Sequence, residues 1–151
     1  MPLSKPPLDE NGEVLPHDHQ GIANVDRVIR RISEEHFVTD AKVAGGKRIS
    51  TMAFQASTDG SRGMSVDLES SIIAGGLDAR KFVTTPRFLG SVWLLVEFLR
   101  SETYLVGYEP LIDNAHHGEV WGKFSKGQQK KLLNNAKWFV EVEGVALPSS
   151  T

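Results

Sequence analysis

Short apolar runs separated by turn residues are the feature that most limits the folds open to this chain. The apolar runs at 90–95 and 104–108, and the segment at 28–32 with its two arginines, are rich in β-branched or aromatic residues and have the length of a strand. Glycine pairs at 45–46 and 75–76 mark turns between such segments. The sequence therefore predicts many short strands joined by turns rather than a bundle of long helices.

Periodicity and capping residues place the individual elements. We expect a turn and then a strand over 24–32, a strand and hairpin over 37–54, and a short strand over 64–66. Asp67 is expected to cap a helix that runs to Ala74 and stops at Gly75. A strand over 90–95, a helix over 96–102 and strands over 104–108 and 117–124 follow. Ser125 should cap a helix over 126–138, and a strand over 139–142 comes last.

Strands thus outnumber helices and do not alternate with them regularly. This predicts an α+β fold, with a mixed or antiparallel sheet of roughly five or more strands flanked by a few helices. Four prolines and an Asn-Gly pair indicate that residues 1–16 form an extended arm, and residues 17–151 then form a single α+β domain.

Composition narrows the protein class. The chain has no cysteine, which excludes disulfides, thiolate zinc sites and cysteine nucleophiles. We expect a cytoplasmic protein with no membrane segment, because the first residues lack the pattern of a secretory signal and the longest apolar run, 88–99, is too short to span a bilayer. The net charge is −2, but the arm is acidic and the helix at 126–138 is basic. The arm is therefore a candidate for binding a protein partner, and the basic helix leaves nucleic acid open as a partner.

Four of the five histidines form two close pairs beside carboxylates. His17 and His19 in an extended segment would point to one side, and His116 and His117 with Asp113 or Glu119 could complete a metal site. Histidines in turns are more commonly solvated or bonded to the backbone, so we expect no bound metal.

Basic residues suggest a second chemistry, the binding of an anion or nucleotide. Arg27, Arg30, Arg31, Lys47 and Arg48 lie in two neighbouring segments, and a polar loop at 57–63 adds hydroxyl groups and Arg62. Adjacent strand residues point to opposite faces, so we expect one of Arg30 and Arg31 to point inward. Trp121, beside the histidine pair, is the tryptophan expected to contact a ligand.

The whole chain resembles a set of short bacterial proteins of uncharacterised function. The strings that carry this resemblance are LPHDH at 15–19, IRRI at 29–32, RIS with AF at 48–54, MSVDL at 64–68, LVGY at 105–108 and HGEVWG at 117–122. A fainter resemblance is to the ADP-ribosyltransferase superfamily, including RES-type toxins that consume NAD. That resemblance implies an arginine on an early strand, a serine opening the next strand and a late glutamate.

The ADP-ribosyltransferase resemblance assigns roles to particular residues. Arg31 or Arg30 would hold the pyrophosphate, Ser50 with Thr51 would orient the glutamate, and Glu119 would stabilise the ribosyl cation. Arg48 is a further candidate for binding the cofactor, and His117 is a further catalytic candidate. Glu141 and Glu143 are the other contenders for the glutamate, as a pair on one strand face. The leading hypothesis is a cytoplasmic NAD-using transferase or glycohydrolase, related to toxins or defence. The alternatives are a non-catalytic partner, immunity or accessory protein, and a histidine–metal phosphoesterase.

Overall fold

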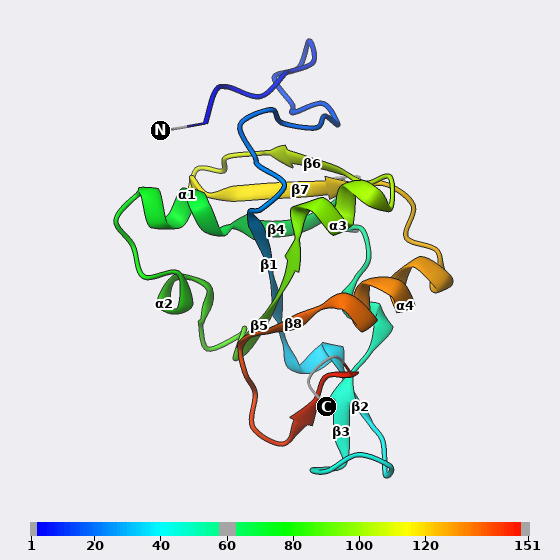
Figure 1. The fold of residues 1–151 in the computed structure, drawn as a ribbon. Helices are drawn as coiled ribbons and strands as arrows, with labels where there is room; N and C mark the ends of the chain where they lie inside the picture. Colours follow the sequence, from blue (N-terminus) through cyan, green and yellow to red (C-terminus); the bar gives the residue numbers. More distant parts are fainter. Residues whose placement is uncertain (1–2, 58–62, 149–151) are drawn as a thin grey trace.

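The computed structural model describes residues 3–57 and 63–148, which form two β-sheets and four short α-helices (Figure 1). The larger sheet has six strands in the order β6-β7-β4-β1-β5-β8, and all of its neighbouring strands are antiparallel. The smaller sheet has the order β2-β3-β9, with β9 parallel to β3. The predicted α+β class, with a largely antiparallel sheet flanked by helices, is therefore confirmed.

The strands of the larger sheet are β1 (Arg27–Ile32), β4 (Met64–Leu68), β5 (Gly90–Leu95), β6 (Leu105–Tyr108), β7 (His117–Trp121) and β8 (Lys137–Val140). The strands of the smaller sheet are β2 (Phe37–Thr39), β3 (Lys47–Ile49) and β9 (Val145–Ala146). The helices are α1 (Glu69–Ala74), α2 (Ala79–Val83), α3 (Val96–Ser101) and α4 (Lys126–Asn135), with two 3-10 turns, η1 (Glu34–His36) and η2 (Thr51–Ala53). No helix in these described parts of the chain is long and apolar enough to cross a membrane.

Both faces of the larger sheet are buried. Val28 and Ile32 of β1 pack in the main apolar cluster together with Leu132 of α4. Ile29, on the opposite face, packs in a smaller cluster with Ile72 of α1 and residues of α2. The helices accordingly flank β1 on opposite sides (Figure 1). Because both faces are covered, a polar side chain on either face must find a partner inside the protein or in a cavity.

Two predicted helix boundaries are wrong. Asp67 does not cap α1, because it lies within β4, where Arg31 binds its carboxylate. The last helix ends at Asn135 rather than at 138, and Trp138 pairs with Val92 in the sheet. Pairing with β5 is a long-range interaction that a local periodicity cannot reveal, and it outweighs the helical pattern at this end.

Three further predictions about the elements need correction. The strand expected over 117–124 ends at Trp121, and the strand expected over 139–142 is β8, which ends at Val140. Glu141 and Glu143 therefore lie beyond β8 and do not share a strand face. Helix α2 and strand β9 were not predicted, since each is short and stabilised by tertiary packing. Residues 58–62 of the polar loop, with Arg62, lie outside the described residues.

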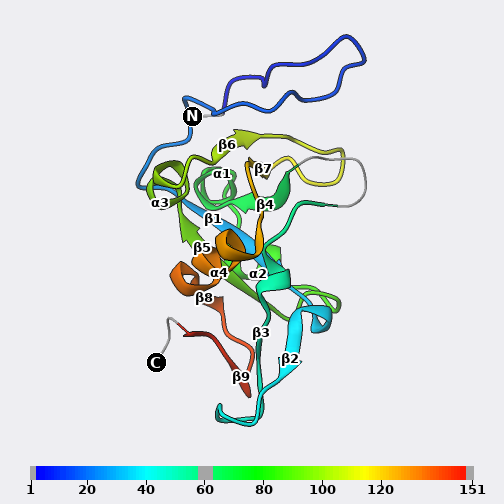
Figure 2. The same cartoon turned by 90° about the vertical axis from the view of Figure 1, so that its right-hand side faces the viewer.

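The N-terminal segment runs along the outer strand β6. Residues 3–16 form no helix or strand apart from a bridge between Leu8 and Val14. The backbone N–H of His19 donates to the Val106 carbonyl at 2.9 Å, and the Asp18 carboxylate accepts from the Val106 N–H at 3.1 Å. Figure 2 shows this segment beside β6, the outermost strand of the sheet. Its residues 17–19 bond to backbone groups of Val106 and Tyr108.

Candidate functional site

Strand β7 carries three chemically versatile side chains on one face. His117, Glu119 and Trp121 alternate along the strand and are 7%, 1% and 6% exposed. In the register of the adjacent strand β4, Ser65 lies opposite Glu119 and Asp67 opposite His117. The sheet therefore gathers two carboxylates, an imidazole and a hydroxyl on one buried face.

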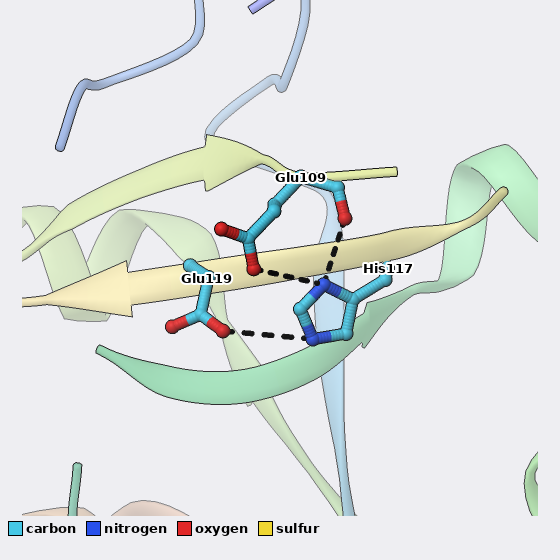
Figure 3. A group of neighbouring side chains, drawn as sticks. All are labelled: Glu109, His117 and Glu119. Atoms are coloured by element: carbon cyan, nitrogen blue, oxygen red, sulfur yellow. Dashed lines mark hydrogen bonds and ion pairs between the residues drawn. The ribbon is translucent and has the colours of Figure 1, made fainter. Parts of the chain in front are cut away.

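Glu109 completes a three-residue cluster with His117 and Glu119 (Figure 3). It directly follows β6, the other neighbour of β7, and residues 109–116 join the two strands. The Glu109 carboxylate lies 3.5 Å from Nδ1 of His117, and the Glu119 carboxylate lies 3.6 Å from Nε2. One ligand atom from each residue lies within 4.8 Å of the others, and within residues 3–57 and 63–148 no other group has this property.

The hydrogen bond of His117 to the backbone determines where its proton lies. Nδ1 is 2.8 Å from the carbonyl oxygen of Glu109, and a carbonyl only accepts, so Nδ1 carries a proton. In the neutral ring Nε2 is then an unprotonated acceptor. It faces a carboxylate oxygen of Glu119, which is also an acceptor, at 3.6 Å. A cation between the two atoms, either a proton on Nε2 or a metal ion, removes this repulsion.

Glu119 is held in place by two features of the neighbouring strand. The Ser65 hydroxyl donates to its carboxylate at 3.2 Å. Gly63 makes room for it, because a Cβ at this position would lie 2.5 Å from Glu119 Oε2 and 2.9 Å from the Val120 carbonyl. The carboxylate is therefore oriented before any ligand binds, and a residue larger than glycine at position 63 would displace it.

Two cavities meet at this face. The first, of about 580 Å³, is lined by arginines, by His36 and by Asp67 and Asn114. The second, of about 620 Å³, is lined by the cluster, by Trp121 and by the arm over residues 12–16. Ser65, Leu111 and His117 line both cavities. A ligand could therefore contact the basic cavity and the carboxylate cluster together.

The predicted arginine pair has opposite orientations and different partners. Arg31 forms a two-point ion pair with Asp67, at 2.8 and 3.1 Å. Arg30 donates to the carbonyl oxygens of Ala53 and Ser65, both at 2.9 Å. Burial lowers the pKa of Arg30 to about 10, although the charges of Glu119 and Asp67 oppose this shift. Arg30 is therefore a cation that its surroundings compensate only in part.

His36 contributes a neutral ring to the first cavity. Its Nδ1 accepts from the backbone N–H of Ser33 at 3.1 Å, which leaves the proton on Nε2. Burial lowers the pKa of His36 to about 4, and the nearby charge of Arg30 adds to this shift. Near neutral pH the ring is thus an uncharged hydrogen-bond donor.

The structure gathers some of the residues singled out from the sequence and leaves others apart. Arg30, Arg31 and His117 line the first cavity, while His117, Glu119 and Trp121 line the second. Ser50 lines neither cavity, and its hydroxyl caps η2 by accepting from the Met52 N–H. Arg48, in β3 of the smaller sheet, pairs with Asp40, which follows β2.

The remaining histidines have structural contacts. His17 accepts from the Tyr108 N–H through Nε2 and bonds to the Leu15 carbonyl through Nδ1. His19 bonds to Ser4 and to the Gly21 N–H, and His116 bonds to the Ser71 hydroxyl. None of these three belongs to the metal-compatible group found among the described residues.

Two residues of the site were missed in the sequence. Glu109 is separated from Glu119 by ten positions and joins it only because β6 and β7 form a hairpin. Ser65 joins Glu119 only through the β4–β7 register. The available signal was weak: an acidic residue at the end of a predicted strand, before Pro110. Comparison of the chain with family models, curated proteins and solved structures finds no match.

Proposed function

We propose that this protein is a hydrolase that uses a divalent metal ion held by Glu109, His117 and Glu119. The observation that carries the proposal is the buried pair of acceptors, Nε2 of His117 and a carboxylate oxygen of Glu119, facing each other at 3.6 Å. Zinc ligands lie about 2.1 Å from the ion, so two of them at the tetrahedral angle are about 3.4 Å apart. The separation of these two acceptor atoms, 3.6 Å, is close to that value.

The hydrogen bond of His117 to the backbone also supports this proposal. Metal-binding histidines usually donate their other ring N–H to a carbonyl or carboxylate, which fixes the tautomer and orients the ring. Nδ1 of His117 makes this bond to Glu109. Glu109 is only partly buried, with 20% of its side chain exposed, so its carboxylate has room to turn toward an ion near Nε2.

The ligand set indicates which ions fit and what they would do. One imidazole and two carboxylates suit Zn²⁺, Mn²⁺ or Fe²⁺. Three protein ligands leave a coordination position free, and the second cavity gives access to the cluster. A divalent ion there would supply Lewis acidity and would activate water near neutral pH.

Metal binding is the direct test of this proposal. Tag-free protein, stripped with a chelator and dialysed, should bind about one equivalent of Zn²⁺ or Mn²⁺ in calorimetry and retain it through gel filtration. Glu109→Gln and Glu119→Gln keep the side-chain shape but remove a ligand charge, so each should weaken binding roughly tenfold or more. Glu143→Gln, an exposed glutamate beyond β8, is the matched control and should bind like wild type.

Hydrolysis is tested with the same proteins. A panel of carboxylate esters, phosphate monoesters and phosphate diesters should include a substrate that wild type cleaves with the metal and not after chelation. Glu119→Gln should lose this activity, while Glu143→Gln should keep it. If the stripped protein binds neither ion at millimolar concentration, the metal proposal is wrong.

The NAD-using enzyme is the second candidate, favoured by the contact between Ser65 and Glu119. The ADP-ribosyltransferase resemblance assigns to a serine the role of orienting a late-strand glutamate. Ser65, rather than Ser50, donates a hydrogen bond to Glu119, and this contact supports the candidate. The first cavity would take the pyrophosphate beside Arg30, and the acidic second cavity would take the cationic nicotinamide. Release of nicotinamide from NAD by metal-free protein, abolished by Glu119→Gln, would favour this enzyme over the hydrolase. Failure of both activities would favour the non-catalytic partner protein.

A further inference from the structure

The first cavity lies where strands β1 and β4 of the larger sheet are no longer paired. Strands β1 and β4 pair at two positions, Val28 with Leu68 and Ile29 with Asp67. Beyond these positions, Arg30 and Arg31 from β1, and Ser65 and Val66 from β4, line the cavity. The cavity thus lies between two strands of the sheet and presents both side chains and backbone to a ligand.

Arg30 is the residue in this cavity that most needs an anion. Its Nε and Nη1 donate to backbone carbonyls, and no carboxylate within the described parts of the chain lies within ion-pair distance of its guanidinium. Carbonyl oxygens satisfy hydrogen bonds but do not neutralise a charge. A bound anion would offset the burial of this cation and could use the remaining N–H groups on Nη2.

The charged side chains that line the interior of this cavity, Arg30, Arg31 and Asp67, have a net positive charge. Asp67 is the acid that is buried here, and it is already bound by Arg31 and by the Asn114 amide at 2.8 Å. Arg30 therefore has no acid paired with it among the lining groups, and the buried Glu119 carboxylate outside the lining offsets its charge only in part. The other charged residues of the lining are Glu35, Arg87 and Asp113, and all three are exposed, so solvent screens them.

Uncharged donors and aromatic walls complete the cavity. His36 presents its Nε2–H, and Ser33 and Asn114 add polar groups. Phe82 and Phe88 form apolar walls. A volume of about 580 Å³ is large enough for an organic molecule rather than for a lone inorganic ion.

We infer that this cavity binds the phosphoryl group of an organic phosphate ester beside Arg30, with the carbon portion of the ester against Phe82 and Phe88. This inference rests on the proposed metal-dependent hydrolase and names its substrate class. His117 lines both cavities, so a phosphoryl group held here borders the metal ligands. Hydrolysis would form a P–O bond to water and break the P–O bond of the ester, and a proton of the water would pass to the departing alcohol.

Binding of inorganic phosphate by metal-free protein tests the subsite independently of the metal. Titration followed by two-dimensional NMR, with the arginine Nε–H signals included, should give saturable shifts for Arg30 and His36 in a constant chloride background. Arg30→Lys keeps the charge but loses the planar donor set, so it should weaken binding roughly tenfold. Arg87→Gln, at the exposed rim, should weaken binding only about twofold to threefold, because solvent screens its charge.

Lys81→Gln is the matched control, since Lys81 is an exposed cation on α2 outside both cavities. It should leave phosphate binding unchanged. Thermal unfolding of each variant establishes that it is folded, and Arg87→Gln keeps the test open if Arg30→Lys does not fold.

The outcomes separate the two proposals. Saturable phosphate binding that Arg30→Lys or Arg87→Gln weakens supports the subsite, even if no metal binds. Metal binding without saturable phosphate shifts at about 10 mM, or shifts that Lys81→Gln weakens equally, overturns the subsite and leaves the hydrolase proposal standing. Cleavage of carboxylate esters but of no phosphate ester also overturns it.

Discussion

Replacing Asp67 by asparagine should destabilise the protein while preserving its shape. The Asp67 side chain is 4% exposed and accepts two hydrogen bonds from Arg31 and one from Asn114. Asparagine has nearly the same volume but no charge, and its amide nitrogen cannot accept. The variant therefore leaves the Arg31 guanidinium without its counter-ion beside the sheet.

The size of this effect follows from the burial of both partners. Removing one partner of a fully buried ion pair typically costs about 3–5 kcal/mol. The Arg31 side chain is 24% exposed, so water can compensate part of its charge, and we expect a loss of about 2–3 kcal/mol in the free energy of unfolding. For a chain of this length, that corresponds to a fall in Tm of about 4–12 °C.

Urea unfolding at neutral pH, followed by tryptophan fluorescence, measures this change. Asp113→Asn is the matched control, because Asp113 lines the same cavity but is exposed, and it should unfold within about 0.5 kcal/mol of wild type. Combining Asp67→Asn with Arg31→Gln should cost clearly less than the sum of the single changes. A midpoint for Asp67→Asn that matches wild type would refute the assignment of this pair as a structural ion pair.

Three further predictions concern stability. The pKa of His36 is lowered in the folded state from 6.5 to about 4, so the unfolded chain takes up the proton first, and the free energy of unfolding should fall as pH decreases from about 6.5 to 4. The unfolding midpoints of wild type and His36→Gln should converge at low pH, and parallel curves would contradict the shift. Gly107→Ala should cost about 2 kcal/mol or more by urea unfolding, because the new Cβ would overlap Trp121 and lie 2.8 Å from the His17 carbonyl, whereas Gly127→Ala, in open space on α4, should not destabilise. Thr103 has a φ of 67°, so Thr103→Gly should raise the free energy of unfolding by about 0.5–1 kcal/mol, and a loss of stability would show that the Thr103 hydroxyl bond to Glu102 matters more than the strain.

Local sequence patterns predict the fold well where local interactions decide it. Ser125 caps α4, and the apolar run over 90–95 forms β5 with the predicted bounds. The pattern fails at the junction of α4 and β8, where Lys137 and Trp138 extend a helical periodicity but pair with β5. Strand pairing at long sequence separation has no local signature, so this boundary could not be placed in advance.

The candidate site was predictable in its residue types and not in its grouping. Glu119, His117 and the two arginines carry reactive groups in distinctive strings, and each lines a cavity. The resemblance predicts that Ser50 contacts the glutamate, but Ser50 caps η2, and the Ser65 hydroxyl donates to Glu119 instead. A strand register determines that choice, and a shift of one residue would turn Ser65 to the other face.

The contacts of residues 17–19 with β6 bear on how the protein behaves at high concentration. An outermost strand with free N–H and C=O groups is a template for strands of other molecules, and it promotes aggregation. Here the Val106 N–H donates to the Asp18 carboxylate and the Tyr108 N–H donates to Nε2 of His17, so both amide groups are already bound to side chains. Because these acceptors belong to side chains, they bind the N–H groups of β6 without forming a further strand edge. Residues 17–19 therefore occupy backbone groups of β6, and a strand of another molecule could pair at these positions only after these contacts broke.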